Sequence, residues 1–297
     1  MGMGFAVRLG AAIGAMAAMP AAAQQAVPPI AAPAVAVLPP GQRPVARPFH
    51  ASKIILVGDS TMQANSGWGG SFCGRHVTMS VACVNLGRGG RSSYSYRAEG
   101  SWEIALGEMK AAGFDRVWVL IQFGHNDMPG KPERSTELGT EFPANMRRYV
   151  EEVRAAGAVP VLVTPLTRRQ FVGGRLVNDL LPWSDAIRKV AAEMQVAVVD
   201  LNAASAAAVD AMGPTAGNRF AQVPPSPEVA AAAATGTTIS TPPLLVAVPP
   251  PTDGPSGKVN LAFDYTHVGR EGADFFAAMV AELLARAVPE TRGVLIR

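Results

Sequence analysis

Short apolar runs alternate along the chain with longer segments of helical periodicity. The runs are bounded by glycine, proline, aspartate or asparagine, and they cover residues 54–57, 82–86, 117–123, 159–164 and 196–201. The helical patterns cover residues 102–112, 142–156, 183–195 and 270–287. Continuous apolar runs of this length are typical of strands buried on both faces. The alternation therefore predicts an α/β fold, a three-layer sandwich with about five parallel strands and helices on both faces.

The first 23 residues have the pattern of an export signal. Arg8 is their only charged side chain, residues 9–19 are small and apolar, and three alanines ending at Ala23 offer a cleavage site. The apolar run is too short to span the roughly 30 Å hydrocarbon core of a bilayer. We expect a periplasmic or secreted protein, cleaved near Ala23, with no stable membrane insertion after cleavage.

Proline is concentrated in two places. Eight of the 25 prolines lie in residues 1–48 and ten lie in residues 214–258. We interpret residues 24–49 as a Pro/Ala-rich linker and residues 50–290 as one domain. Within it, residues 214–258 form an expected Pro-rich insertion that bulges from the fold, without regular structure except at residues 228–234.

Composition excludes several classes of protein. The formal net charge of +3 is too small and too scattered for a nucleic-acid-binding surface. Two cysteines are too few for a disulfide-dense scaffold or a cysteine-based zinc site. In an exported protein Cys73 and Cys83 can form a disulfide; the alternative is a pair of buried thiols. The sequence leaves both possibilities open.

Four polar blocks follow predicted strands or precede the last predicted helix. They are GDST at residues 58–61, GRGGRS at 87–92, GHND at 124–127 and DYTH at 264–267. In an open parallel sheet, functional groups gather beyond the carboxyl ends of the strands. The ordered set of blocks therefore predicts one site at that edge.

The chain resembles the SGNH/GDSL hydrolase superfamily, and within it the rhamnogalacturonan acetylesterase-like carbohydrate esterases. The four blocks stand in family order, and the stretches at residues 94–102 (YSYRAEGSW) and 164–171 (TPLTRRQF) strengthen the likeness. It covers roughly residues 53–211 and 262–287, so the Pro-rich segment departs from the pattern, as does the doubled glycine at 89–90. The resemblance implies the flavodoxin-like SGNH fold.

The residue types predict serine-hydrolase chemistry. A serine hydroxyl becomes a good nucleophile only when a positioned base removes its proton. His267 can remove the proton of Ser60, and Asp264 can orient the imidazole and stabilise its cation. By the family pattern, the Ser60 amide, the Gly90 amide and the Asn126 side chain form the oxyanion hole.

Each of these residues also has a plainer interpretation. Ser60 could be a helix N-cap, His267 a surface histidine, Asn126 a turn residue and Gly90 a turn glycine. The combination of blocks favours the catalytic interpretation. A two-metal phosphoesterase would need more histidines than the four in this chain, so we expect no metal and no cofactor.

Substrate contacts are less specific in the sequence. The family's substrates and the bidentate binding of carboxylates by arginine suggest a polymer that contains galacturonate. The candidates are Arg91, Arg97, Trp102, Arg168 and Arg169. Each can equally be explained as a core aromatic residue, an ion-pair partner or part of a solvated face.

The sequence predicts an exported serine esterase that removes O-acetyl groups from a pectin-type polysaccharide or oligosaccharide through an acetyl-enzyme. The alternative is a broad-specificity SGNH lipase, thioesterase or arylesterase that acts on longer acyl esters with the same residues. The polymer, the acetyl position, the oligomeric state and the role of residues 214–258 are not predicted.

Overall fold

The computed structural model describes residues 51–239, 261 and 263–297, together with Met1, Pro39 and Gly41. The expected signal peptide (residues 1–23) and most of the expected linker (residues 24–49) lie outside the described residues. One compact unit runs from Pro48 to Arg297 and contains all of the strands and helices given below.

Five parallel strands form the central sheet, in the order β2-β1-β3-β4-β7. This is the flavodoxin-like order, so the predicted fold class is confirmed. The strands occupy Ala51–Gly58 (β1), Val81–Asn85 (β2), Phe114–Gln122 (β3), Val159–Val163 (β4) and Ala197–Val199 (β7). A short antiparallel hairpin, Phe171–Val172 (β5) with Arg175–Leu176 (β6), lies outside this sheet.

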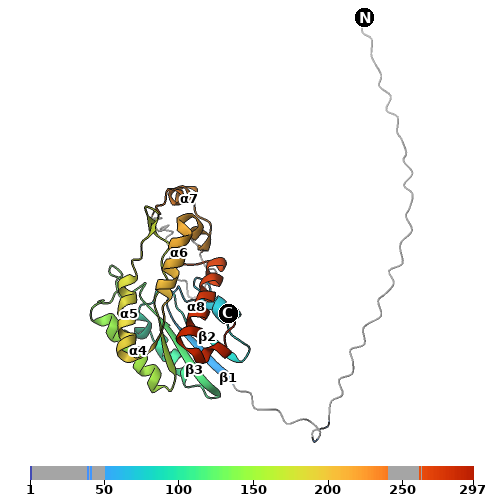
Figure 1. The fold of residues 1–297 in the computed structure, drawn as a ribbon, viewed down its shortest axis with the longest axis vertical. Coiled ribbons are helices and arrows are strands. Elements are labelled where there is room, and N and C mark those ends of the chain that lie inside the picture. Colours follow the sequence, from blue (N-terminus) through green and yellow to red (C-terminus); the bar gives the residue numbers. More distant parts are fainter. Residues whose placement is uncertain (2–38, 40, 42–50, 240–260, 262) are drawn as a thin grey trace, which may run out of the picture. The chain divides into compact units, whose positions relative to one another are not determined.

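The side chains of β1 explain why helices are needed on both faces of the sheet. Ile54 and Leu56 belong to one apolar core, and Ile55 and Val57 belong to another, because successive side chains of a strand point to opposite faces. All four are fully buried. The two cores form the two interfaces of a three-layer sandwich (Figure 1).

Helices cover both faces of the sheet. The Ile54 face packs against Gly69–Arg75 (α1), Leu201–Gly217 (α6) and Arg270–Ala287 (α8). The Ile55 face packs against Ser101–Met109 (α3), Glu141–Ala155 (α4) and Leu181–Met194 (α5). The remaining described helices are Ser95–Ala98 (α2), Pro227–Ala234 (α7) and 3₁₀ turns at Asn218–Phe220 and Pro289–Gly293. None of the described helices is long and apolar enough to cross a membrane.

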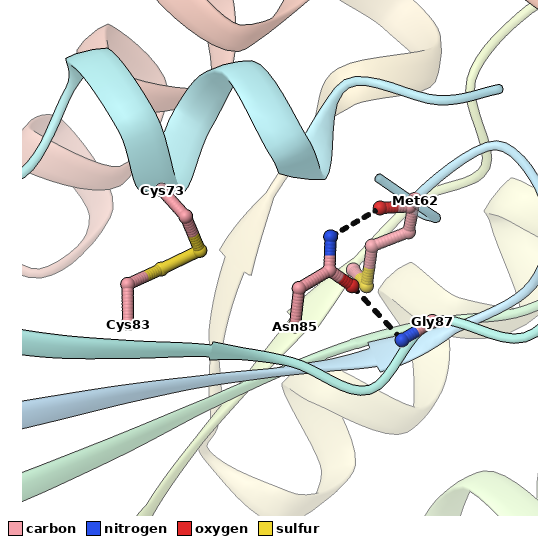
Figure 2. The surroundings of a disulfide bond; sticks show 5 residues. All are labelled: Met62, Cys73, Cys83, Asn85 and Gly87. Atoms are coloured by element: carbon pink, nitrogen blue, oxygen red, sulfur yellow. Dashed lines mark hydrogen bonds between the residues drawn. A yellow bond between two sulfur atoms is a disulfide. The ribbon is translucent and has the colours of Figure 1, made fainter. Parts of the chain in front are cut away.

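Cys73 of α1 and Cys83 of β2 form a disulfide, with their Cα atoms 5.3 Å apart. Figure 2 shows this bond beside Asn85, which lies on the same strand. The Asn85 side chain donates to the carbonyl of Met62 (3.0 Å) and accepts from the amide of Gly87 (2.9 Å). The strand that carries the disulfide therefore also holds the segment that follows β1.

The Pro-rich segment differs from its prediction over residues 214–239. Pro214 lies inside α6, after a kink at Gly213. Phe220 is buried, and the centroid of its ring lies 5.4 Å from that of Phe276. The amide of Thr238 donates to Phe171 at 2.9 Å. The expectation of a bulging segment without regular structure is wrong at Pro214, Phe220 and Thr238, because these residues lie in α6 or pack on α8 and on the hairpin. The exception expected at residues 228–234 corresponds to α7 (Pro227–Ala234). Residues 240–258 lie outside the described part.

Candidate active site

Ser60 lies in a tight turn directly after β1. The preceding Gly58 is required by a close approach, because a Cβ there would lie 2.7 Å from the carbonyl oxygen of Gln122 on β3. The Asp59 carboxylate accepts from the amide and from the hydroxyl of Thr61, both at 2.8 Å. The turn therefore holds Ser60 beyond the carboxyl end of the strand, where its side chain reaches a cavity.

His267 joins Ser60 to Asp264. Its Nε2 atom lies 2.8 Å from Ser60 Oγ, and its Nδ1 atom lies 2.7 Å from Asp264 Oδ2. The other carboxylate oxygen of Asp264 accepts from the backbone amides of Thr266 (2.7 Å) and His267 (2.6 Å). The structure thus brings together the three residues that the sequence predicted as a triad.

The ionisation of Asp264 determines which nitrogen of His267 carries the proton. Burial alone raises the pKa of Asp264, but hydrogen bonds and charge from His267, with the amide of Thr266, hold that pKa below its usual value. An ionised carboxylate can only accept, so Nδ1–H of His267 donates to it. Nε2 is then free to accept the hydroxyl proton of Ser60, which is the arrangement that a general base needs.

The predicted oxyanion-hole groups line the same cavity as Ser60. Gly90 has a φ of +78°, a conformation that favours glycine. Among the described residues, no hydrogen bond occupies the backbone N–H of Ser60 or of Gly90. The side-chain amide of Asn126 donates to the Arg91 carbonyl at 3.0 Å. The structure places these groups around one cavity, as the sequence predicted.

His125 and Asp127 of the GHND block contact the segments on either side of the loop that carries Asn126. The His125 ring is buried beside Asp59, with Nδ1 3.4 Å from the carboxylate. Asp127 accepts from the amide and hydroxyl of Ser93, from Thr136 and from the amide of Gly124. Both residues therefore tie the Asn126 loop to its neighbours.

The cavity has a volume of about 520 Å3, and apart from two glycines each described residue that lines it has a side chain with a polar or charged group. None of the described residues that line it has an aliphatic side chain or the side chain of phenylalanine, tyrosine or tryptophan. The lining consists of Ser60, Gln63, Asn65, Ser66, Gly89, Gly90, His125, Asn126, Lys131, Arg134, Arg168, Gln222, Asp264, Thr266 and His267. Among the residues that the structure describes, no cluster of three or more histidine, cysteine or carboxylate side chains could hold a metal ion.

Three of the predicted substrate contacts are wrong. Trp102 is fully buried and donates to Glu152, so its ring cannot reach a sugar. Arg97 pairs with the same carboxylate at 2.7 Å and lies over the rings of Trp102 and Tyr149. Arg169 is also buried rather than facing the cavity, and it donates to backbone carbonyls of residues 264–267, the segment that carries Asp264 and His267 (the catalytic loop).

The other two predicted arginines have separate positions. Arg168 lines the cavity and pairs with Asp179. Arg91 pairs with Glu99 at 2.7 Å and donates to Gly89, and it does not line the cavity. Of the five candidates, only Arg168 lines the cavity.

Two cavity cations were missing from the sequence prediction. Lys131 donates to the carbonyl of His125 and lies 3.4 Å from Asn126 Oδ1, and Arg134 donates to the Gly90 carbonyl at 3.3 Å. Burial and repulsion from Arg168 and Arg134 lower the pKa of Lys131. Lys131 and Arg134 follow the GHND block by only a few residues, and this position was the one signal in the sequence that could have found them. Gln222 was also missed, because it lies in the Pro-rich segment that we expected to be peripheral.

The fold and the site define a class, the three-layer α/β carboxylic-ester hydrolases. The chain belongs to the GDSL-like Lipase/Acylhydrolase family, whose model matches residues 56–232. It is 35% identical over 157 residues to the probable rhamnogalacturonan acetylesterase YesY of Bacillus subtilis, covering 51% of this chain and 70% of that protein. Rhamnogalacturonan acetylesterase RhgT of the same organism is 34% identical over 176 residues, covering 57% of this chain and 72% of that protein.

A solved structure supports the fold. The crystal structure of the protein YxiM of Bacillus subtilis superposes with a TM-score of 0.56 at 23% identity. The match covers 81% of this chain and 58% of that one, so this chain spans little more than half of that structure.

Proposed function

We propose that this protein is an exported carbohydrate acetylesterase that removes O-acetyl groups from an acidic, pectin-type polysaccharide. The observation that carries the proposal is the hydrogen-bonded series from Ser60 through His267 to Asp264. Two relatives above 30% identity are named for acetylesterase activity on rhamnogalacturonan. The family and the geometry together support ester hydrolysis by a serine nucleophile.

The proposed reaction has two halves. Ser60 Oγ attacks the ester carbonyl while His267 Nε2 takes its proton, and the resulting oxyanion accepts from Ser60 N–H, Gly90 N–H and Asn126. His267 then gives the proton to the departing sugar oxygen, which leaves an acetyl-enzyme. A water molecule, deprotonated by His267, attacks that ester; His267 then returns the proton to the departing Ser60 Oγ, which releases acetate and free Ser60.

The cavity lining supports a short acyl group on a polar substrate. A long acyl chain is bound by apolar side chains, and the described lining offers none. Lys131, Arg134 and Arg168 instead place three cations at the cavity, and only Arg168 has a carboxylate within 4 Å among the described residues. Cations in this position favour a sugar that carries carboxylates, as galacturonate does.

Export is supported by two separate features. The first 23 residues have the composition of a signal peptide. The Cys73–Cys83 disulfide is of a kind that persists in oxidising compartments such as the periplasm and the medium.

The experiment measures acetate release from acetylated rhamnogalacturonan by the mature protein and by its Ser60→Ala variant. We expect release by the wild type alone, and none from polymer deacetylated beforehand with alkali. Parallel assays with acetylated xylan and with 4-nitrophenyl acetate and octanoate separate the outcomes. A preference for xylan would move the substrate to a neutral glycan, and a preference for octanoate would refute the acetylesterase function.

A further inference from the structure

Arg169 connects the loop after β4 to the catalytic loop. Its side chain is 1% exposed, and one nitrogen, Nη2, donates to the backbone carbonyls of both Asp264 and His267 at 2.8 Å. Its own backbone amide donates to the carbonyl of Tyr265 at 2.9 Å. One residue therefore holds three of the four carbonyls between Asp264 and His267.

The catalytic loop has different anchors on its two sides. After His267, the amide of Val268 donates to Ser66 at 2.9 Å and the amide of Gly269 donates to Phe220 at 2.8 Å. Before it, every hydrogen bond that the described residues outside the loop make with the backbone of Asp264 and Tyr265 comes from Arg169. Among the described residues, Arg169 is therefore the anchor outside the loop for the backbone of Asp264 and Tyr265.

The charge of Arg169 has no dedicated partner. Among the described residues no carboxylate lies within 4 Å of it, and its Nε and Nη1 atoms are buried without a hydrogen-bond acceptor. Burial lowers the pKa of Arg169 to about 10, so the side chain is still a cation at neutral pH. A buried, half-satisfied cation contributes little to stability compared with an apolar side chain of the same volume. Stability therefore does not explain its presence, whereas the two carbonyls that it holds do.

We propose that Arg169 is a positioning residue for hydrolysis: it holds Asp264 and His267 where the imidazole of His267 can contact Ser60. The inference rests on the proposed serine mechanism. Rates fall by about 10²-fold when a reacting group is misplaced by an ångström. Since Arg169 holds backbone atoms of both residues, its loss shifts the imidazole and its carboxylate together.

The test compares Arg169→Met, Arg169→Lys and Arg97→Met with 4-nitrophenyl acetate, a substrate too small to need sugar contacts. Arg97 is the matched control, since it is a second, mostly buried arginine, and neither it nor its partner Glu152 lines the cavity. We expect Arg169→Met to lower kcat about 10²-fold with KM within twofold. Arg169→Lys keeps the charge and one donor, so it recovers part of kcat. Arg97→Met lowers Tm without lowering kcat.

A second comparison uses His267→Ala as the background. Arg169→Met should reduce kcat no further there, because the imidazole that it positions is already gone. A merely structural role would lower both activities in proportion to the folded fraction. If Arg169→Met does not fold, Arg169→Lys carries the same comparison, with a smaller loss of kcat that again vanishes in the His267→Ala background.

The outcomes separate this inference from the proposed function. An unchanged kcat in a folded Arg169 variant, with Ser60→Ala inactive, overturns the positioning role alone. A raised KM for acetylated pectin with unchanged kcat would show that Arg169 contributes to substrate binding and does not position the triad. Full activity of Ser60→Ala would instead refute the serine mechanism, and the positioning role with it.

Discussion

Nε2 of His267 lies 2.8 Å from Oγ of Ser60, although 207 positions separate the two residues in the chain. Ser60 comes from the end of the first strand, and His267 comes from the loop before the last helix. The sheet order places β1 next to β3, whose carboxyl end leads to Asn126. Parallel strand ends therefore collect groups from distant parts of the sequence at one edge.

Replacing His267 by alanine removes the proposed base. We expect His267→Ala to lower kcat for 4-nitrophenyl acetate by at least about 10⁴-fold. His267 is partly exposed, so Tm should change little, and a thermal unfolding scan checks this. A rate within tenfold of the wild type would show that another group takes the proton.

Asn126→Ala removes one proposed oxyanion donor. Loss of a single donor of this type costs about 10²-fold in kcat. KM for a small ester should remain similar, since the donor acts mainly on the charge that develops in the transition state. Steady-state kinetics measure both. A loss confined to KM would make Asn126 a substrate-binding residue instead.

Lys131→Met should weaken binding of acidic polymer more than binding of a neutral ester. One partly exposed cation accounts for about 1 kcal/mol, so KM for acetylated pectin should rise roughly fivefold. Arg175→Met is the control, because Arg175 is exposed on the hairpin and does not line the cavity. Equal effects on pectin and on its carboxyl-reduced form would contradict an electrostatic role.

Asp127 gives the protein a distinctive stability profile with pH. Burial raises the pKa of Asp127 from 3.8 to about 6. Hydrogen bonds from Ser93 and Thr136 lower this pKa in part, whereas the charge of nearby Asp59 raises it further. A raised folded-state pKa contributes stability that is fully present below about pH 4 and is lost as the pH rises through about 6. Asp59 acts in a separate window, because its pKa is lowered and its contribution is lost below its ordinary value of 3.8.

Asp127→Asn tests this assignment. The amide leaves some donors unpaired, so we expect the free energy of unfolding to fall by about 2 kcal/mol at neutral pH. The variant should also lose the decrease of Tm that Asp127 causes in the wild type between pH 4 and 6. Calorimetry at several pH values follows both effects. Parallel Tm profiles of the two proteins across this range would reject the raised pKa.

Because of the disulfide, we expect the Cys73→Ser variant to have a measurably lower stability than the wild type. Closing a loop of this length stabilises the folded state by about 2–3 kcal/mol. For a domain of this size the loss corresponds to a decrease of about 5–10 °C in Tm. A reducing agent should lower the Tm of the wild type to that of the variant and leave the variant unchanged. Equal values before and after reduction would show that the bond adds no stability.

Much of the fold could be predicted because burial on two faces leaves a clear pattern. The run at residues 54–57 lies in β1, and the predicted helix at residues 270–287 has the bounds of α8. The helix α6 was missed because its alanine-rich sequence has no strong apolar periodicity. The hairpin of β5 and β6 was missed because its strands have only two residues each.

The site was predictable where chemistry restricts the residue type, and less so elsewhere. Ser60, His267 and Asp264 stand in short blocks at strand ends or before a helix, so their meeting followed from topology. An arginine has no such pattern: Arg168 and Arg169 are neighbours, yet one lines the cavity and the other is buried. Only the path of the loop after β4 decides between them.

The distance along the chain between Ser60 and His267 also makes the proposed reaction depend on both ends of the domain. Synthesis proceeds from the N-terminus, and the segment of His267 emerges after nearly all of the sheet and its covering helices. A chain that lacks this segment holds the serine turn but not the imidazole of His267, the proposed base. Under the proposed mechanism, hydrolysis therefore requires the segment that leads into the last helix, so esterase activity reports that this end of the fold is in place.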